Sequence, residues 1–208
     1  MNNFSKINPA RAAMLIIDME KAFVEPGAAL CIAGAKASVP FIAQAAAVAR
    51  ECGAKIFWVK RIYAADGSDM ERPRFLDLSR RGLIGAGVLA PNSTGLNSIE
   101  EPDGLVPAPT DITIIKPRFS AFFGTDLQNE LKKFGIDTVI LTGTTTPNCI
   151  RTTCYDAISY DFRTVVLEKC CSSNTPEIQA ANIADMERIG AEIYRGEDFA
   201  EIFQNDRP

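Results

Sequence analysis

A chain of 208 residues, 47% of them hydrophobic and 23% charged, has the size and composition of one globular domain. The formal net charge of −4 and the lack of any lysine- and arginine-rich run argue against binding to nucleic acid or to an anionic membrane, so a small molecule is the expected partner. The first residues lack the apolar segment of a signal peptide, and no apolar run approaches the roughly 20 residues that span a bilayer, so a cytoplasmic protein is expected.

Short β-branched runs alternate with amphipathic stretches along the chain, which predicts an α/β fold whose parallel strands are joined by helices. Each run is so apolar that helices are expected to cover both faces of the sheet, giving three layers. The six expected strands span residues 13–17, 55–59, 112–115, 138–141, 164–167 and 191–194.

Helical periodicity and capping residues predict helices between these strands. The expected segments run from Val39 to Gly53, from a capping box at Thr125-Asp-Leu-Gln128 to Gly135, from Thr175-Pro176 to Gly190, and over a short last helix at about 197–203. Between the second and third strands, residues 62–110 form a connection far longer than the roughly 4–6 residues that are usual. This Gly/Pro/Ser-rich insertion, with one helical candidate at 74–81, is expected to be a lid, an interaction surface or a surface loop within a single domain of residues 1–208.

The sequence contains no histidine. This absence excludes Ser-His-Asp and Cys-His mechanisms and histidine-ligated zinc, so any catalysis must use carboxylate, lysine, thiol or a bound cofactor. The six cysteines form no Cys-x-x-Cys pair and are expected as thiols.

Chemically active side chains follow several of the expected strands. Asp18 follows the first strand, Arg61 the second, Lys116 the third, and a loop that ends at Cys149 follows the fourth. Ligands of open parallel sheets bind beyond the carboxyl ends of the strands, so these side chains are expected to meet. Singly, each has an ordinary explanation: a packed thiol, a local cap or a solvated lysine.

Cys149 lies where this loop is expected to turn into a helix, so its thiol is expected in the first helical turn. Backbone N–H groups and the helix dipole favour an anion there, and a cationic neighbour such as Lys116 is expected to lower the thiol pKa further. The same N–H groups could receive the negative charge that develops on a substrate carbonyl oxygen.

At these residues the chain resembles the isochorismatase-like cysteine hydrolase superfamily, which includes nicotinamidases, N-carbamoylsarcosine and ureidoacrylate amidohydrolases and biuret-type hydrolases. The resemblance covers nearly the whole chain, and the third of its motifs is the specific one. The motifs are Leu15-Ile-Ile-Asp18-Met, Lys116-Pro-Arg-Phe-Ser-Ala-Phe123 with Thr125-Asp-Leu, and Leu141-Thr-Gly-Thr-Thr-Thr-Pro-Asn-Cys149-Ile-Arg-Thr-Thr-Cys-Tyr-Asp-Ala157.

The resemblance implies a six-stranded, mostly parallel, Rossmann-like sheet and a catalytic triad of Asp18, Lys116 and Cys149. It also implies a cis peptide bond between Thr144 and Thr145, with the N–H groups of Thr145 and Cys149 forming an oxyanion hole. The activity implied is hydrolysis of an amide-type C–N bond through a thioester-type intermediate, with neither a metal nor an organic cofactor. Relatives are commonly oligomeric, so a homodimer or homotetramer is expected by analogy.

Two departures from the family pattern stand out. Where relatives commonly carry Gln and then Asp-Phe after the first motif, this chain has Glu20-Lys-Ala-Phe23, so those side-chain contacts are in question. Nicotinamidases of the superfamily bind a divalent ion through histidines, so a nicotinamidase of that type is not expected here.

Candidate substrate contacts complete the hypothesis. Arg61 and Arg118 follow strand ends and could clamp a carboxylate, which favours a small acidic amide or ureido compound; otherwise they are surface or interface residues. Phe23, Phe119 and Tyr155 are candidates for the pocket wall or for the core. Two other functions remain open: vinyl-ether hydrolysis of the isochorismatase type, and a catalytically silent scaffold on the same fold.

Overall fold

The computed structural model of this chain describes residues 5–85 and 87–204. Within these ranges, six strands form one sheet in the order β3-β2-β1-β4-β5-β6, and every neighbouring pair is parallel. The strands are β1 (Ala12–Ile17), β2 (Lys55–Arg61), β3 (Ile112–Lys116), β4 (Thr138–Thr144), β5 (Arg163–Ser172) and β6 (Glu192–Tyr194). The predicted six-stranded α/β sheet is confirmed, and it is wholly rather than mostly parallel.

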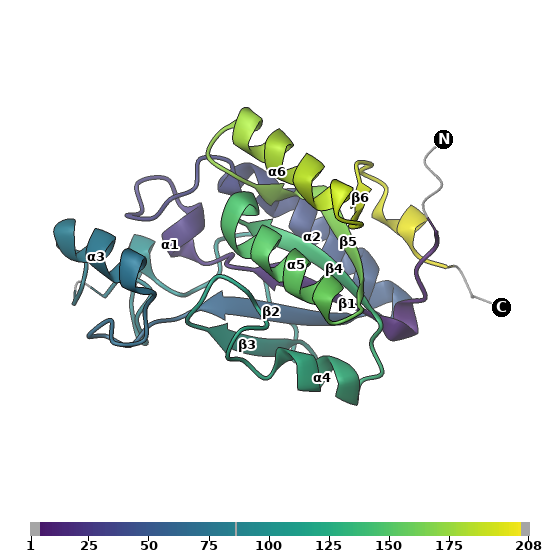
Figure 1. Cartoon of the computed structure of the whole chain (residues 1–208), viewed down its shortest axis with the longest axis horizontal. Helices are drawn as coiled ribbons and strands as arrows, with labels where there is room; N and C mark the ends of the chain where they lie inside the picture. The colour runs from purple at the N-terminus through teal and green to yellow at the C-terminus, as the bar shows by residue number, and fades with distance from the viewer. Residues whose placement is uncertain (1–4, 86, 205–208) are drawn as a thin grey trace.

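Helices lie on both sides of this sheet (Figure 1). One side packs against α2 (Ala35–Cys52) and the 3-10 helix η4 (Phe199–Ile202), and the other packs against α4 (Leu127–Lys133), α5 (Arg151–Ser159) and α6 (Pro176–Arg188). Another 3-10 turn, η1 (Pro9–Arg11), precedes β1. None of the described helices is both long enough and apolar enough to cross a membrane.

The central strand β1 shows why the apolar runs become strands with two covered faces. Successive side chains of a strand point to opposite faces, so Leu15 and Ile17 join the core under α4, α5 and α6, whereas Met14 and Ile16 join the core under α2. The edge strand β3 departs from this pattern, because Ile115 is 57% exposed. The expectation that helices cover both faces of every strand is therefore wrong for β3, which pairs with β2 only.

Two of the predicted helix boundaries are present as expected. Helix α2 ends at Cys52, and Gly53 follows in the left-handed conformation with φ +92°. Thr175 caps α6, because its side chain accepts a hydrogen bond from the Ile178 N–H. The last predicted helix is present as the 3-10 helix η4.

The capping box predicted at Thr125 does not form. The Thr125 side chain accepts from the Leu127 N–H at 3.3 Å, and the Thr125 N–H donates to the Phe122 carbonyl. The hydroxyl itself donates to the Ala121 carbonyl, so Thr125 closes the turn before α4, and Asp126 rather than Thr125 precedes the first helical residue.

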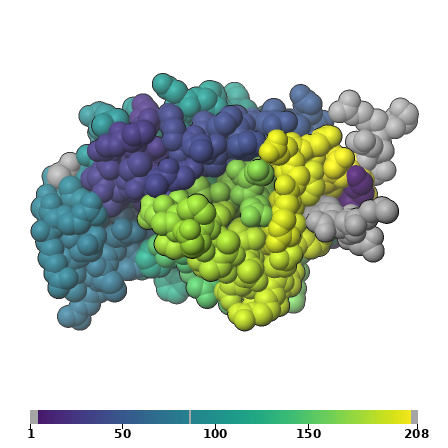
Figure 2. Space-filling view, turned by 90° about the horizontal axis from the view of Figure 1, so that it is seen from above, coloured from purple at the N-terminus to yellow at the C-terminus, as the bar shows by residue number. Residues whose placement is uncertain are grey.

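The insertion of residues 62–110 has its own small hydrophobic cluster. It contains α3 (Arg72–Arg80) and the 3-10 turn η2 (Gly95–Asn97), and it packs against the short helix α1 (Lys21–Val24). Phe23, Tyr63, Leu78 and Leu89 are buried together in this cluster. Figure 1 shows α1 and α3 at the end of the molecule toward which the strands point, so the insertion stands beside the carboxyl edge of the sheet. In Figure 2 the blue-teal atoms of the insertion's first part lie at the same end.

Candidate active site

Asp18 and Lys116 form a buried ion pair at the carboxyl edge of the sheet. Asp18 follows β1 with φ +51°, and its N–H donates to the Val59 carbonyl at 2.9 Å, which fixes the turn out of the strand. Lys116 is the last residue of β3, and its Nζ donates to Asp18 Oδ2 at 2.9 Å and to the Arg118 carbonyl at 3.1 Å. Asp18 Oδ1 has no hydrogen-bond partner of normal geometry among the described residues, so one carboxylate oxygen is available to accept a proton.

Cys149 lies in the turn that connects β4 to α5. This turn, Thr146–Ile150, is a π-helical turn rather than the first turn of an ordinary α-helix, so the local geometry differs from the expected one. The Thr144–Thr145 peptide bond that precedes the turn is cis. The Cys149 side chain is only 3% exposed and packs within the core on the α5 side of the sheet.

The thiol of Cys149 is less acidic than the sequence suggested. Burial, followed by the charge of Asp18, raises its pKa from 9.0 to about 11, while the positive charges of Lys116 and Arg61 act in the opposite direction. Desolvation of a thiolate is costly, and here it outweighs the two cations. The expectation that its position lowers the thiol pKa is therefore wrong, and ionisation of Cys149 at neutral pH requires a base.

Arg61 is the residue that the structure brings into direct contact with the sulfur. Its guanidinium Nη1 donates to Cys149 Sγ at 3.3 Å, and the whole side chain is buried. Its Nε donates to the Tyr63 hydroxyl and its Nη2 to the Glu71 carboxylate, while its face lies 4.7 Å from the Phe119 ring centroid. Burial lowers the pKa of Arg61, but the neighbouring acidic groups more than offset that effect and raise it overall.

Three residues near this site were not predicted from the sequence as site residues. Tyr63 and Glu71 belong to the insertion and touch Arg61, and the Tyr63 hydroxyl donates to Glu71 Oε2 at 3.2 Å. The carboxylate of Glu20 accepts a hydrogen bond from the Arg61 N–H, and burial together with the charge of Asp18 raises the pKa of Glu20 well above its usual value. Glu20 could have been noticed from the sequence, because it stands where relatives commonly carry Gln. The contact of Glu71 with Arg61 could not, because it depends on how the insertion folds back onto the sheet.

The predicted substrate contacts fall into two groups. Phe119 joins the cluster through its contact with Arg61, and Phe23 is buried with Tyr63 in the insertion cluster. The Arg118 guanidinium donates to the carbonyls of Asp69 and Pro117, which ties the segment after β3 to the insertion. Within the described part of the chain, Arg118 forms no salt bridge with a carboxylate.

Tyr155 is placed apart from this cluster. Its hydroxyl donates to Asp185 Oδ2 of α6 at 2.8 Å, and its ring lies beneath the Arg151 guanidinium. Tyr155 lines a separate hollow of about 270 Å³ on the outer side of α5, with Pro147 and Thr152. These contacts do not support the prediction that Tyr155 forms the wall of a pocket at Cys149.

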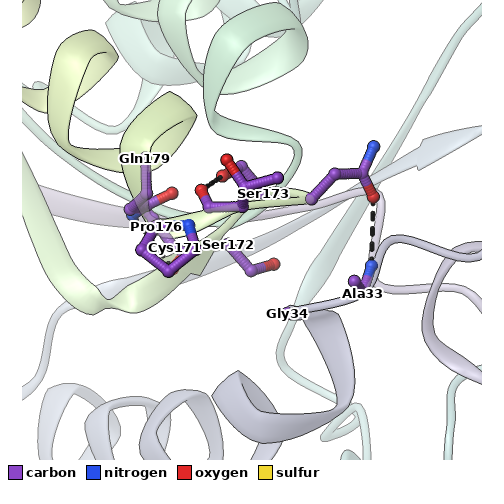
Figure 3. A pocket seen from close by; sticks show the side chains of 9 residues that line it. Ala33, Gly34, Cys171, Ser172, Ser173, Pro176 and Gln179 are labelled. Atoms are coloured by element: carbon purple, nitrogen blue, oxygen red, sulfur yellow. Dashed lines mark hydrogen bonds between the residues drawn. The ribbon is translucent and has the colours of Figure 1, made fainter.

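A second hollow, of about 370 Å³, opens where β5 passes into α6 (Figure 3). Its walls include Gly34, Cys171 and Ser172. The Ser172 carbonyl accepts a hydrogen bond from the Thr146 hydroxyl at 3.0 Å, so this hollow shares a structural element with the turn that carries Cys149.

The remaining cysteines are free thiols, and the described residues contain no cluster of three or more His, Cys, Asp or Glu side chains that could hold a metal ion. Cys154, Cys170 and Cys171 are buried, and burial raises the pKa of Cys154 to about 12. Among the buried thiols, Cys149 is the one whose sulfur accepts a hydrogen bond from an arginine and lies beside a carboxylate.

The geometry defines a class of protein. It is a three-layer, parallel α/β protein in which a thiol, a carboxylate, an ammonium and a guanidinium group meet at the carboxyl edge of the sheet, close to the point where the strand order reverses between β1 and β4. The chain belongs to the isochorismatase domain family, whose model matches residues 12–198. It is a member of the isochorismatase-like hydrolase superfamily with amidohydrolase relatives.

Three relatives illustrate the range of that family. A protein of Arabidopsis thaliana called a probable inactive nicotinamidase is 38% identical over 86% of this chain and 89% of its own length. Ureidoacrylate amidohydrolase of Pantoea ananatis is 30% identical over 86% of this chain and 76% of its own length. Maleamate amidohydrolase of Pseudomonas putida is 28% identical over 90% of this chain and 84% of its own length.

Solved structures show the same fold. An isochorismatase family protein from Desulfovibrio vulgaris superimposes with a TM-score of 0.81 at 40% identity, covering 88% of this chain and 93% of its own. A cysteine hydrolase from Pseudomonas syringae superimposes with a TM-score of 0.83 at 26% identity, covering 95% of this chain and 93% of its own.

Proposed function

We propose that this chain is a cysteine amidohydrolase that cleaves a C–N bond of a small amide or ureido compound. The observation that carries the proposal is the buried cluster of Asp18, Lys116 and Cys149, in which three groups from three strand ends meet. The amidohydrolase relatives support the same class of reaction.

In the proposed mechanism, Asp18 acts as the base. Asp18 Oδ1 accepts the proton of Cys149, and the thiolate attacks the substrate carbonyl carbon. As the C–N bond breaks, Asp18 returns that proton to the leaving nitrogen, and ammonia or an amine departs. Water, deprotonated by Asp18, then cleaves the thioester-type intermediate, which releases the acid and restores the Cys149 thiol.

The Lys116 side chain and two backbone N–H groups stabilise the negative charges that develop during the proposed reaction. Lys116 holds Asp18 in place and stabilises the negative charge on the cluster, because its Nζ already donates to Asp18 Oδ2. The backbone N–H groups of Thr145 and Cys149 form the proposed oxyanion hole. No metal or organic cofactor takes part in the proposed reaction. The proposed enzyme is a cytoplasmic homodimer or homotetramer, the oligomeric state being proposed by analogy with relatives.

The proposed substrate is a small carboxylic acid that carries an amide or ureido group. Maleamate and ureidoacrylate, in the names of two relatives, are compounds of this kind. Arg118 is the better candidate to bind the carboxylate, because it has no acidic partner among the described residues whereas Arg61 is paired with Glu71. Phe119 and Phe23 are the proposed apolar walls.

The deciding experiment measures ammonia release from a panel of primary amides and ureido acids, with wild type compared with Cys149→Ala. We expect turnover by wild type and loss of at least about 10³-fold in the variant, because the nucleophile is removed. Cys154→Ala, which removes another buried thiol of the same helix region, is the matched control and should retain activity. Equal activity of wild type and Cys149→Ala would exclude the thiol as nucleophile, and isochorismate turnover by both would favour vinyl-ether hydrolysis.

A second measurement tests the substrate class through Arg118→Ala. We expect KM for acidic amides to rise roughly 10–100-fold, the equivalent of about 1.5–3 kcal/mol for a lost charged hydrogen bond, with little change for neutral amides. Arg151→Ala, which removes an arginine paired with Asp185 on the outside of the molecule, is the control. An equal loss for acidic and neutral amides would contradict a carboxylate-binding role.

The catalytically silent scaffold is the second candidate, because the Arabidopsis relative is called a probable inactive nicotinamidase. Under this alternative the whole panel is inert, and Cys149 reacts with iodoacetamide no faster than the other buried thiols. Mass spectrometry of the alkylated peptides separates the two functions even while the natural substrate is unidentified.

A further inference from the structure

We propose that Arg61 is a further catalytic residue, which donates a hydrogen bond to the Cys149 thiolate and is held in that orientation by Tyr63 and Glu71 of the insertion. This inference rests on the proposed role of Cys149 as nucleophile. It replaces the expectation from the sequence that Arg61 clamps a substrate carboxylate.

The contact with the sulfur is direct. Arg61 Nη1 lies 3.3 Å from Cys149 Sγ, and both side chains are buried, with Arg61 fully excluded from solvent. A guanidinium group is a permanent cation with donors in a rigid plane, so once its plane is fixed the direction of Nη1 toward the sulfur is fixed as well. In a buried site, such a donor stabilises an anion more strongly than the same donor does in water.

Two other nitrogens of the Arg61 guanidinium also donate to protein groups. Nε donates to the Tyr63 hydroxyl, Nη2 donates to Glu71, and the Tyr63 hydroxyl in turn donates to the second oxygen of Glu71 at 3.2 Å. The Arg61 N–H donates to Glu20, and the Phe119 ring lies against the guanidinium face. Tyr63 therefore holds Nε and Glu71 holds Nη2, which fixes the guanidinium plane with Nη1 directed at Cys149.

This arrangement balances the charges around the sulfur. The charged groups that face Cys149 are Asp18 after β1, Lys116 at the end of β3 and Arg61 at the end of β2, while Glu71 and Tyr63 face the far side of Arg61. When the thiol proton passes to Asp18, that carboxylate becomes neutral, and the negative charge moves to Sγ. The charge is then held between the Arg61 guanidinium and the Lys116 ammonium, and it is consumed when the S–C bond to the substrate forms.

Glu71 is the positioning residue of this set. It precedes α3 of the insertion, so the insertion supplies a group that orients a catalytic cation without touching the sulfur itself. The Arg61–Glu71 ion pair also explains why Arg61 is a poor site for a substrate carboxylate, since a resident carboxylate already occupies Nη2.

The test is the pH profile of iodoacetamide alkylation of Cys149, followed by peptide mass spectrometry, which requires no amide substrate. We expect Arg61→Met to raise the thiol pKa and so to shift the profile to higher pH. A rise of about one pH unit would lower the thiolate fraction, and with it the alkylation rate at pH 9, about tenfold. Arg61→Lys, which keeps the charge but loses the planar fork, should lie between wild type and Arg61→Met. Arg151→Met, an exposed arginine two residues after Cys149, should keep the wild-type profile.

The two possible roles of Glu71 predict opposite effects of Glu71→Gln on Cys149 alkylation. If Glu71 acts only as a nearby negative charge, Glu71→Gln should lower the thiol pKa and speed alkylation; if it orients Arg61, alkylation should slow. Tyr63→Phe removes a neutral hydroxyl and should slow alkylation as well. A shift of the Glu71→Gln alkylation profile to lower pH would overturn the positioning role, and a faster rate at every pH with an unshifted profile would also overturn it, as the sign of an effect on access alone.

Folding and the proposed function are tested separately. Circular dichroism checks that each variant is folded, and if Arg61→Met does not fold, Arg61→Lys and Tyr63→Phe decide the question. A wild-type alkylation profile in folded Arg61→Met or Arg61→Lys, joined to a rise in KM confined to acidic amides, would overturn the proposal in favour of substrate binding. An inert amide panel with shifted alkylation profiles would refute the amidohydrolase activity and leave the Arg61 contact standing.

Discussion

The Cys149 thiol is subject to opposing effects of burial and charge. Burial and Asp18 raise its pKa, while Lys116 and Arg61 lower it, and the net value of about 11 leaves the thiol protonated at neutral pH. Because the same carboxylate that raises the thiol pKa is the proposed base, the proton transfer and the loss of the opposing charge are a single event. At neutral pH the site therefore holds a neutral thiol, whose ionisation depends on transfer of the proton to the proposed base.

The variant Asp18→Asn tests whether Asp18 is both the opposing charge and the base, because it should make the thiol easier to ionise but slow amide turnover. Removing the negative charge should lower the thiol pKa, so alkylation of Cys149 should begin at lower pH than in wild type. Removing the base should nevertheless lower amide turnover by roughly 10²–10⁴-fold. The measurement pairs an iodoacetamide pH profile with an ammonia-release assay.

Asp77→Asn, a change of the same chemistry at an exposed position of α3, is the control for this pair of assays. It should leave both unchanged. A variant Asp18→Asn that loses activity while its alkylation profile moves to higher pH would contradict the assignment of Asp18 as an opposing charge beside the sulfur.

The turn between β4 and α5 is the element that positions the nucleophile. The register between β4 and β5 shifts between Leu141 and Gly143, and Gly143 has φ +111°. A Cβ atom at Gly143 would lie 2.0 Å from the Ile17 carbonyl oxygen, which is backbone of β1 and cannot move aside. Glycine is therefore required here for two independent reasons, its positive φ and the close approach of β1.

Gly143→Ala should consequently fail to fold or lose more than about 4 kcal/mol of stability, since the clash is with backbone rather than with a flexible side chain. Gly135→Ala is the matched control. Gly135 also has a positive φ, of +65°, but no described atom lies within 4 Å of an added Cβ, so a cost of about 1–2 kcal/mol is expected. Thermal unfolding followed by circular dichroism compares the two variants, and similar melting temperatures would contradict the packing argument.

At the scale of the whole molecule, the insertion stands over the carboxyl edge of a sheet whose site is almost completely closed. Cys149 is 3% exposed, and the insertion contacts the site through Glu71 on Arg61 and through Asp69 on Arg118. A substrate can reach the sulfur only if some of these residues move. We propose that the insertion opens to admit substrate, because most of its buried residues belong to a small hydrophobic cluster distinct from the two cores on either side of the sheet.

Leu78→Ala tests whether the insertion controls access. Leu78 is fully buried in the insertion cluster, and its truncation costs roughly 2–5 kcal/mol of local packing, so Cys149 alkylation should become about tenfold faster or more. Leu131→Ala is the control, because Leu131 is equally buried but belongs to the main core under α4. It should lower the melting temperature without speeding alkylation at 25 °C, and faster alkylation in Leu131→Ala alone would contradict the gating role.

The strand pattern, the lack of histidine and the three residues Asp18, Lys116 and Cys149 can be read from the sequence, because apolar periodicity and position after a strand are local properties. The exposed face of β3, the pKa of Cys149 and the position of Tyr155 could not be, since each depends on neighbours distant in the chain. The contacts of Arg61 with Cys149 and Glu71 also belong to this second group. Sequence by itself determined which chemical groups stand at the strand ends, whereas tertiary structure decided which of them touch and how strongly burial changes their acidity, because desolvation and hydrogen bonding act through space rather than along the chain.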